Sequence, residues 1–69
     1  MSDTWVKVAA SEVRPGQRVR LGNGTELTAT RIEPRFFGMD NMVAFVEDTD
    51  VRWYKQPTTV DAEVEVLRG

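Results

Sequence analysis

The chain has 69 residues, no cysteine, no histidine and a formal net charge of -2. A chain of this length is expected to form one domain, residues 1–69, near the lower limit for burying a core unaided, and no disulfide or thiolate zinc site can stabilise it. Its start, MSDTWVKVAAS, lacks the features of a secretory signal, and no window approaches the ~20 apolar residues of a membrane span. We therefore expect a cytoplasmic protein with no membrane partner.

Short alternating segments separated by Gly, Pro, Asn and Asp predict an all-β chain. The first strand is expected at residues 5–9. Ser11 can then cap one short helical turn near residues 11–14. A Pro-Gly pair reverses the chain into a second strand at residues 17–21.

The register of the next hairpin follows from its side-chain pattern. A two-residue Asn-Gly loop would place apolar and polar side chains on the same side of the sheet. A three-residue loop at 22–24, with its last glycine at positive φ, instead places Val19 opposite Leu27 and Arg20 opposite Glu26. The three-residue loop is therefore predicted, with both arginines of RVR pointing outward.

The alternation changes in the strand that follows. Ile32 has the opposite parity to Leu27 and Ala29, so this strand is expected to twist or bulge before Pro34 ends it. The last strand, at residues 63–66, alternates strictly and should turn its valines inward.

Residues 42–46 are apolar on both faces, which is typical of a strand with protein on each side. A solvated acidic turn at 47–50 is expected to lead into a strand at 51–55. This register places Trp53 opposite Ala44 and facing the core.

Five to six short antiparallel strands with one helical turn predict a small SH3-like barrel. An open meander that dimerises through an edge strand is the main competing architecture, because a small sheet has edges to cover.

The run ASEVRPGQRVRLGNGTELTATRI, residues 10–32, resembles the opening of many small β-barrel modules. With the closing run VEDTDVRWYKQPTTVDAEVEVLR, residues 46–68, the whole chain is similar to a family of short uncharacterised proteins of phages that infect actinobacteria. The resemblance implies a phage accessory protein made inside a host cell. It implies no catalytic residue.

The residue types argue against catalysis. Without histidine and cysteine, the usual general base, the thiolate nucleophile and the commonest metal ligands are missing. Glu47, Asp48 and Asp50 cluster at a tight turn, whereas hydrolytic carboxylates need a cleft, and a calcium loop needs a glycine and a distal glutamate. We therefore expect no enzyme, no cofactor and no metal site.

A nucleic-acid-binding barrel is the alternative function. Its Arg-rich face would consist of Arg18, Arg20, Arg31 and Arg35. Single-stranded nucleic acid uses such mixtures of positive charge and aromatic rings. Seven acidic side chains against three basic ones in residues 36–69 make this function less favoured than protein binding.

The segment EPRFFGMDN, residues 33–41, carries large apolar side chains where a loop is expected. In an extended backbone adjacent phenylalanines point to opposite sides, so one ring can cap the barrel end while the other is left over. Either both rings plug the barrel, or the loop binds a protein, and a homodimer that buries the second ring is a variant of protein binding. We predict a non-catalytic interaction module whose contact residues are Arg35, Phe36, Phe37 and Met39, with Trp5 and Tyr54 as neighbours.

Overall fold

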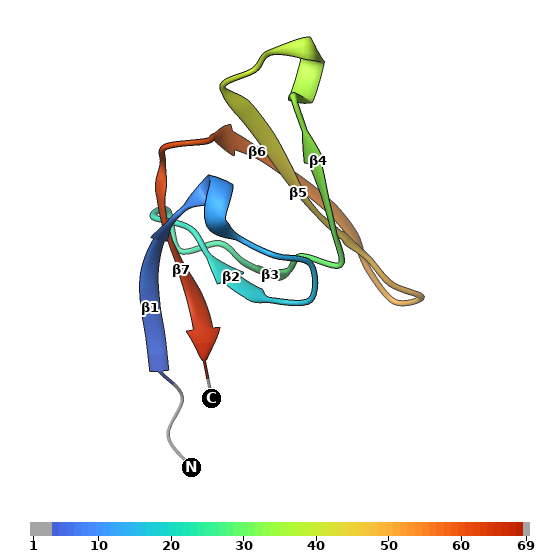
Figure 1. Cartoon of the computed structure of the whole chain (residues 1–69). Coiled ribbons are helices and arrows are strands. Elements are labelled where there is room, and N and C mark those ends of the chain that lie inside the picture. The colour runs from blue at the N-terminus through green and yellow to red at the C-terminus, as the bar shows by residue number, and fades with distance from the viewer. Residues whose placement is uncertain (1–3, 69) are drawn as a thin grey trace.

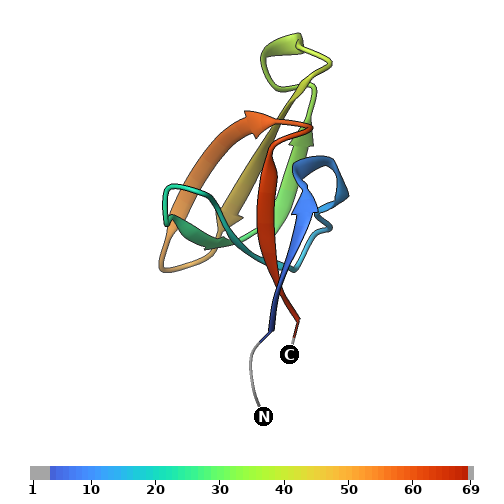
Figure 2. The ribbon, with the colours of Figure 1, turned by 90° about the vertical axis from the view of Figure 1, so that its left-hand side faces the viewer.

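The computed structural model describes residues 4–68, which form β-strands and two short 3₁₀ turns. The elements are β1 (Thr4–Ala9), η1 (Ala10–Glu12), β2 (Arg18–Arg20), β3 (Glu26–Thr28), β4 (Arg31–Pro34), η2 (Phe36–Gly38), β5 (Met42–Asp48), β6 (Trp53–Thr59) and β7 (Glu63–Arg68). They make two antiparallel sheets (Figures 1 and 2): sheet A, in the order β1-β7-β2-β3, and sheet B, in the order β4-β5-β6. The all-β class is confirmed, with seven strands in the described residues.

The β2–β3 hairpin has the predicted register. Val19 lies opposite Leu27, and Arg20 lies opposite Glu26. Gly24 adopts φ 89°, as the three-residue loop requires. The hydrophobic pattern therefore determined this register correctly.

The change of parity after Ala29 marks a passage between the sheets. The chain leaves sheet A at Thr28 and enters sheet B at Arg31. Leu27 faces the core from sheet A, and Ile32 packs against the same core from sheet B. The two residues face the same interior from different sheets, so their parity differs.

The β5–β6 turn lies two residues later than predicted. The last pair of the hairpin is Asp48 with Trp53, and the Thr49 N–H donates to the Arg52 carbonyl at 2.8 Å. Val51, which was expected in a strand, sits at this turn with 94% of its surface exposed.

The inward orientation predicted for Trp53 is wrong. Val43 and Phe45 are the residues of β5 that join the core. Ala44 and Val46 point to the outer face of sheet B, and Trp53 lies on that face with 59% of its surface exposed. Because β5 is apolar on both faces, alternation alone did not identify the side that faces the core.

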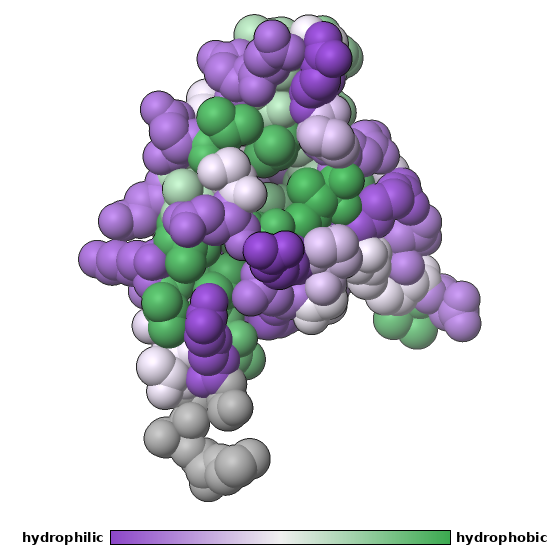
Figure 3. All heavy atoms as spheres, viewed as in Figure 1, coloured by the Kyte–Doolittle hydropathy of each residue, from purple (hydrophilic) through white to green (hydrophobic). Residues whose placement is uncertain are grey.

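The core lies between the two sheets and draws on both. It contains Val19, Leu27, Val64 and Val66 from sheet A and Val43 and Phe45 from sheet B. On the face shown in Figure 3, hydrophobic residues appear near the middle and hydrophilic residues surround them. The sheets are not closed into the predicted barrel, since β3 ends sheet A and β6 ends sheet B without pairing.

The predicted helical turn is the 3₁₀ turn η1, which begins at Ala10 rather than Ser11. Its N-terminal flank is Ala9, whose N–H donates to a Glu12 carboxylate oxygen at 3.0 Å. Ser11 therefore does not cap this turn. Within residues 4–68, the structure has no helix of the length and apolar character that crossing a bilayer requires.

Candidate functional site

The η2 loop, residues 35–41, projects beyond the ends of β4 and β5 (Figures 1 and 2). Arg35 has φ 54° and Phe37 has φ 57°, so both non-glycine residues are left-handed, and Gly38 follows at φ 72°. Each non-glycine residue in this conformation costs about 1 kcal/mol or more. Backbone hydrogen bonds of 2.8 and 3.1 Å close the turn. The loop therefore holds its side chains in a defined but costly conformation.

The two phenylalanine rings do not point to opposite sides, because the backbone is not extended here. Their centroids are 4.4 Å apart, and the rings are tilted by 53°. Phe36 is half-buried, whereas Phe37 has 85% of its surface exposed. Met39 is also exposed, at 48%. The spare ring predicted from the sequence is therefore Phe37.

Arg35 and Asp40 bridge the two ends of the loop. The Arg35 Nε lies 2.9 Å from an Asp40 carboxylate oxygen, and both side chains are largely exposed. An exposed ion pair of this kind contributes little to stability. Its effect is to bring together the chain on either side of the aromatic turn.

The outer face of sheet B adjoins the loop. The Lys55 Nζ lies 5.5 Å from the Phe36 ring centroid and 5.8 Å from the Trp53 ring centroid. It donates to a Glu33 carboxylate oxygen at 2.9 Å. This hydrogen bond holds the pKa of Glu33 below its ordinary value, against the opposing effect of desolvation. The structure thus places a cation between an aromatic residue of the loop and one of β6.

Sequence reasoning missed Trp53 and Lys55 as parts of this face. On this face Val46 lies opposite Lys55, and Ala44 lies opposite Pro57. Both Ala44 and Val46 are fully buried, although they point away from the core between the sheets. Long side chains on the outer face cover them. The signal in the sequence was that β5 is apolar on both faces. We interpreted this pattern as protein on each side of the strand, whereas on the outer face the apolar residues are covered by long side chains of the same sheet.

Trp5 and Tyr54 do not join the η2 loop. Trp5 is half-buried on β1 of sheet A, where the Arg20 guanidinium lies 4.2 Å from its ring centroid. Tyr54 packs against the core, and its hydroxyl donates to Gln56 at 2.7 Å. The structure therefore brings together Arg35, Phe36, Phe37 and Met39 but places the two expected neighbours elsewhere.

The four arginines of the alternative nucleic-acid site are spread over two sheets and a loop. Each has a carboxylate partner: Arg18 pairs with Glu26 and Glu47, Arg20 with Glu65, Arg31 with Glu33 and Asp48, and Arg35 with Asp40. Arg20 thus bonds to Glu65 rather than to the opposed Glu26. These pairs leave little uncompensated positive charge for phosphate groups.

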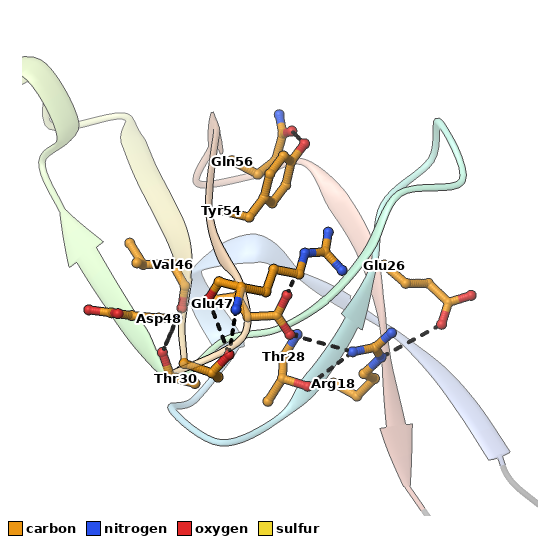
Figure 4. A network of polar contacts seen from close by, with 11 residues as sticks. Arg18, Glu26, Thr28, Thr30, Val46, Glu47, Asp48, Tyr54 and Gln56 are labelled. Atoms are coloured by element: carbon orange, nitrogen blue, oxygen red, sulfur yellow. Dashed lines mark hydrogen bonds and ion pairs between the residues drawn. The ribbon is translucent and has the colours of Figure 1, made fainter.

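Glu47 is a buried carboxylate rather than part of a solvated turn. Figure 4 shows its polar contacts. One oxygen accepts the Thr28 N–H at 3.0 Å and lies 3.7 Å from Arg18. The other lies 3.0 Å from the Arg52 Nε, but without the alignment of a hydrogen bond. Glu47 therefore connects β5 to β3, across the boundary between the sheets.

A shallow pocket of about 270 Å³ lies away from the loop, beside β1 and β7. It is lined by Lys7, Val8, Ala9, Glu12, Asp61 and Glu63. No group of three His, Cys, Asp or Glu residues within 4–68 is arranged to hold a metal ion.

Comparison with protein families, with curated proteins and with solved structures finds no match to this chain.

Proposed function

We propose that this chain is a non-catalytic interaction module that binds a protein through its η2 loop. The observation that carries the proposal is the side chain of Phe37, which is 85% exposed on a backbone in the left-handed conformation. A small protein gains nothing in core stability from such a residue, and strained residues are enriched at binding sites. Phe37 and Met39 together supply the apolar, adaptable contact typical of interface hot spots.

The partner that fits this loop has an apolar pocket. Phe37 projects from a short turn, so it can enter a concavity, and Arg35 beside it supplies a charged rim. Full burial of one phenylalanine is worth about 1.5–3 kcal/mol, which corresponds to roughly 10- to 100-fold in affinity. The ion pairs of the arginines favour this function over the nucleic-acid alternative.

We also propose that the fold is an opened form of an SH3-like barrel. β3 and β4 follow each other directly, one at the edge of sheet A and the other at the edge of sheet B. This continuity supports a single bent strand shared by two sheets, as small barrels use. The resemblance to actinobacteriophage proteins supports an accessory role in the cytoplasm of an infected cell, on a host or phage protein.

The test is capture of partners from an actinobacterial lysate by the wild-type chain and by two variants. Phe37→Ser should lose the captured protein while remaining folded, since its side chain is exposed. Val51→Ser removes another exposed apolar side chain, at the β5–β6 turn, and should capture normally. Titration calorimetry with the captured protein should show an affinity loss of roughly 10- to 100-fold for Phe37→Ser alone. Equal capture by both variants would refute the proposal.

A further inference from the structure

β1 is the outermost strand of sheet A and pairs only with β7 among the described strands (Figures 1 and 2). Its other side is an edge of six residues that includes no proline. An edge of this kind displays backbone donors and acceptors that another strand can bind. This edge is separate from the η2 loop, so pairing through it does not depend on the proposed function.

The backbone bonds at the end of β1 show which groups face outward. The Ala10 N–H donates to Ala62 at 2.8 Å, on the β7 side. Because the direction alternates along a strand, the N–H groups of Trp5, Lys7 and Ala9 face away from β7. That of Ala9 is bound by the Glu12 carboxylate at 3.0 Å. The open part of the edge is therefore centred on Trp5 and Lys7.

The other edge strands of the described chain are shorter or interrupted. On β6, the Val60 N–H donates toward β5, so the same alternation puts Pro57 in an outward position where it offers no donor. On β3, the Thr28 N–H is bound by Glu47. β4 has four residues and ends in Pro34. β1 is thus the longest uninterrupted edge among the described strands.

We propose that β1 pairs with β1 of a second copy of this chain, antiparallel and across a two-fold axis at Val6. Outward-facing residues must oppose outward-facing residues, so within the open part of the edge the two-fold axis can lie at Trp5, Val6 or Lys7. A two-fold axis at Lys7 would place the positive charges of the two Lys7 side chains opposite each other. An axis at Trp5 would pair only residues 4–6 of the described chain. Centring on Val6 pairs residues 4–8.

The register at Val6 is chemically self-complementary. Trp5 of each copy lies opposite Lys7 of the other, which forms two cross-strand cation–π neighbours. The Lys7 side chain is 68% exposed, and its ion-pair partner among residues 4–68 is Glu63, at 4.0 Å. This long contact leaves the ammonium group accessible to a second chain. The two valines meet on the side of β1 that packs on the core. An interface of about five residue pairs is smaller than a standard protein–protein interface. The dimer should therefore be weak, and its population should depend on concentration.

Sedimentation velocity from micromolar to about 1 mM protein tests the proposal. The wild-type chain should dimerise over this range. Lys7→Pro removes an outward donor and should weaken the dimer by at least about tenfold. Lys7→Gln keeps the N–H and should dimerise better than the proline variant. Phe37→Ser, which alters the other surface, should dimerise as the wild type does.

Amide exchange provides a readout on the folded wild-type chain. The amides of Trp5 and Lys7 should gain protection as concentration rises, while those bonded to β7 should not change. A chain that is monomeric at about 1 mM overturns the proposal and leaves the edge to a strand from another protein. Dimerisation lost in Phe37→Ser but kept in both Lys7 variants also overturns it, because the interface would then be the loop.

Discussion

One residue of the η2 loop combines a strained backbone with an exposed side chain. Phe37 has a left-handed backbone, which glycine adopts at no steric cost, and an aromatic side chain that is largely in water. Neither property stabilises the isolated chain. The residue is therefore explained better by a contact with another molecule than by folding.

Two substitutions of Phe37 should separate the energetic cost of its backbone conformation from the effect of losing its ring. Phe37→Gly removes both the ring and the steric cost, whereas Phe37→Ala removes the ring and keeps the cost. We expect the glycine variant to be more stable than the alanine variant by about 0.5–1 kcal/mol, after allowance for the greater entropy of the unfolded glycine chain. Urea denaturation measures this difference, and an alanine variant of equal or greater stability would contradict the left-handed conformation.

The Glu33–Lys55 pair predicts a pH dependence. The folded chain lowers the pKa of Glu33 from an ordinary value of 4.5, chiefly through the hydrogen bond from Lys55. The pair therefore contributes stability above that value, and the contribution is lost as the pH falls through the lowered pKa.

Lys55→Met removes the charge and keeps an apolar stem, so it should raise the pKa of Glu33 toward its ordinary value. Titration of the Glu33 carboxyl carbon by NMR measures the shift. Lys7→Met is the matched control, because Lys7 lies beside Glu63 and not beside Glu33. A Glu33 pKa that is the same in wild type and Lys55→Met would show that another group causes the shift.

At the scale of elements, the boundary between β3 and β5 depends on one side chain. β3 and β5 belong to different sheets, and the Glu47 carboxylate spans them by accepting the Thr28 N–H. It also compensates two half-exposed arginines, Arg18 and Arg52. The Glu47 carboxylate thus links β5 to β3 at the boundary where a closed barrel would have backbone hydrogen bonds between strands.

Glu47→Ala should lower the free energy of unfolding by about 2–3 kcal/mol, because it leaves the Thr28 N–H unsatisfied and two arginines uncompensated. Glu47→Gln keeps an acceptor for that N–H and should cost less. Asp48→Ala, at the exposed neighbouring position, is the control and should cost least. Chemical denaturation gives the ranking, and equal losses in Glu47→Ala and Asp48→Ala would mean that the carboxylate does not connect the sheets.

The two hairpins show why one register was predictable and the other was not. In β2–β3, a shift by one residue would expose Val19 or Leu27, so burial selects a single register. In β5–β6, Pro57 rather than the predicted Trp53 lies opposite Ala44, a shift of four residues. An even shift keeps every side chain on the same face, so alternation does not distinguish the two registers.

At the scale of the whole molecule, both sheets contribute to one core. Separate unfolding of either sheet would expose the residues of the other. We therefore expect a single cooperative transition, as is usual for small domains.

The two tryptophans report on the two sheets separately. Trp53→Phe leaves Trp5 in sheet A as the fluorophore, and Trp5→Phe leaves Trp53 in sheet B. In each variant, the urea transition followed by fluorescence should coincide with that followed by circular dichroism. Different midpoints for the two probes would show that the sheets unfold independently.

The sequence by itself determined the all-β class, the β2–β3 register, the inward valines of β7 and an aromatic surplus at residues 36–37. These depend on alternation and turn chemistry, which act over a few residues. Only the tertiary structure decided which face of β5 meets the core, that Glu47 is buried and that the sheets stay open. It also decided that Lys55 lies between the rings of Phe36 and Trp53. Those outcomes depend on contacts between strands distant in the chain, which local patterns do not encode.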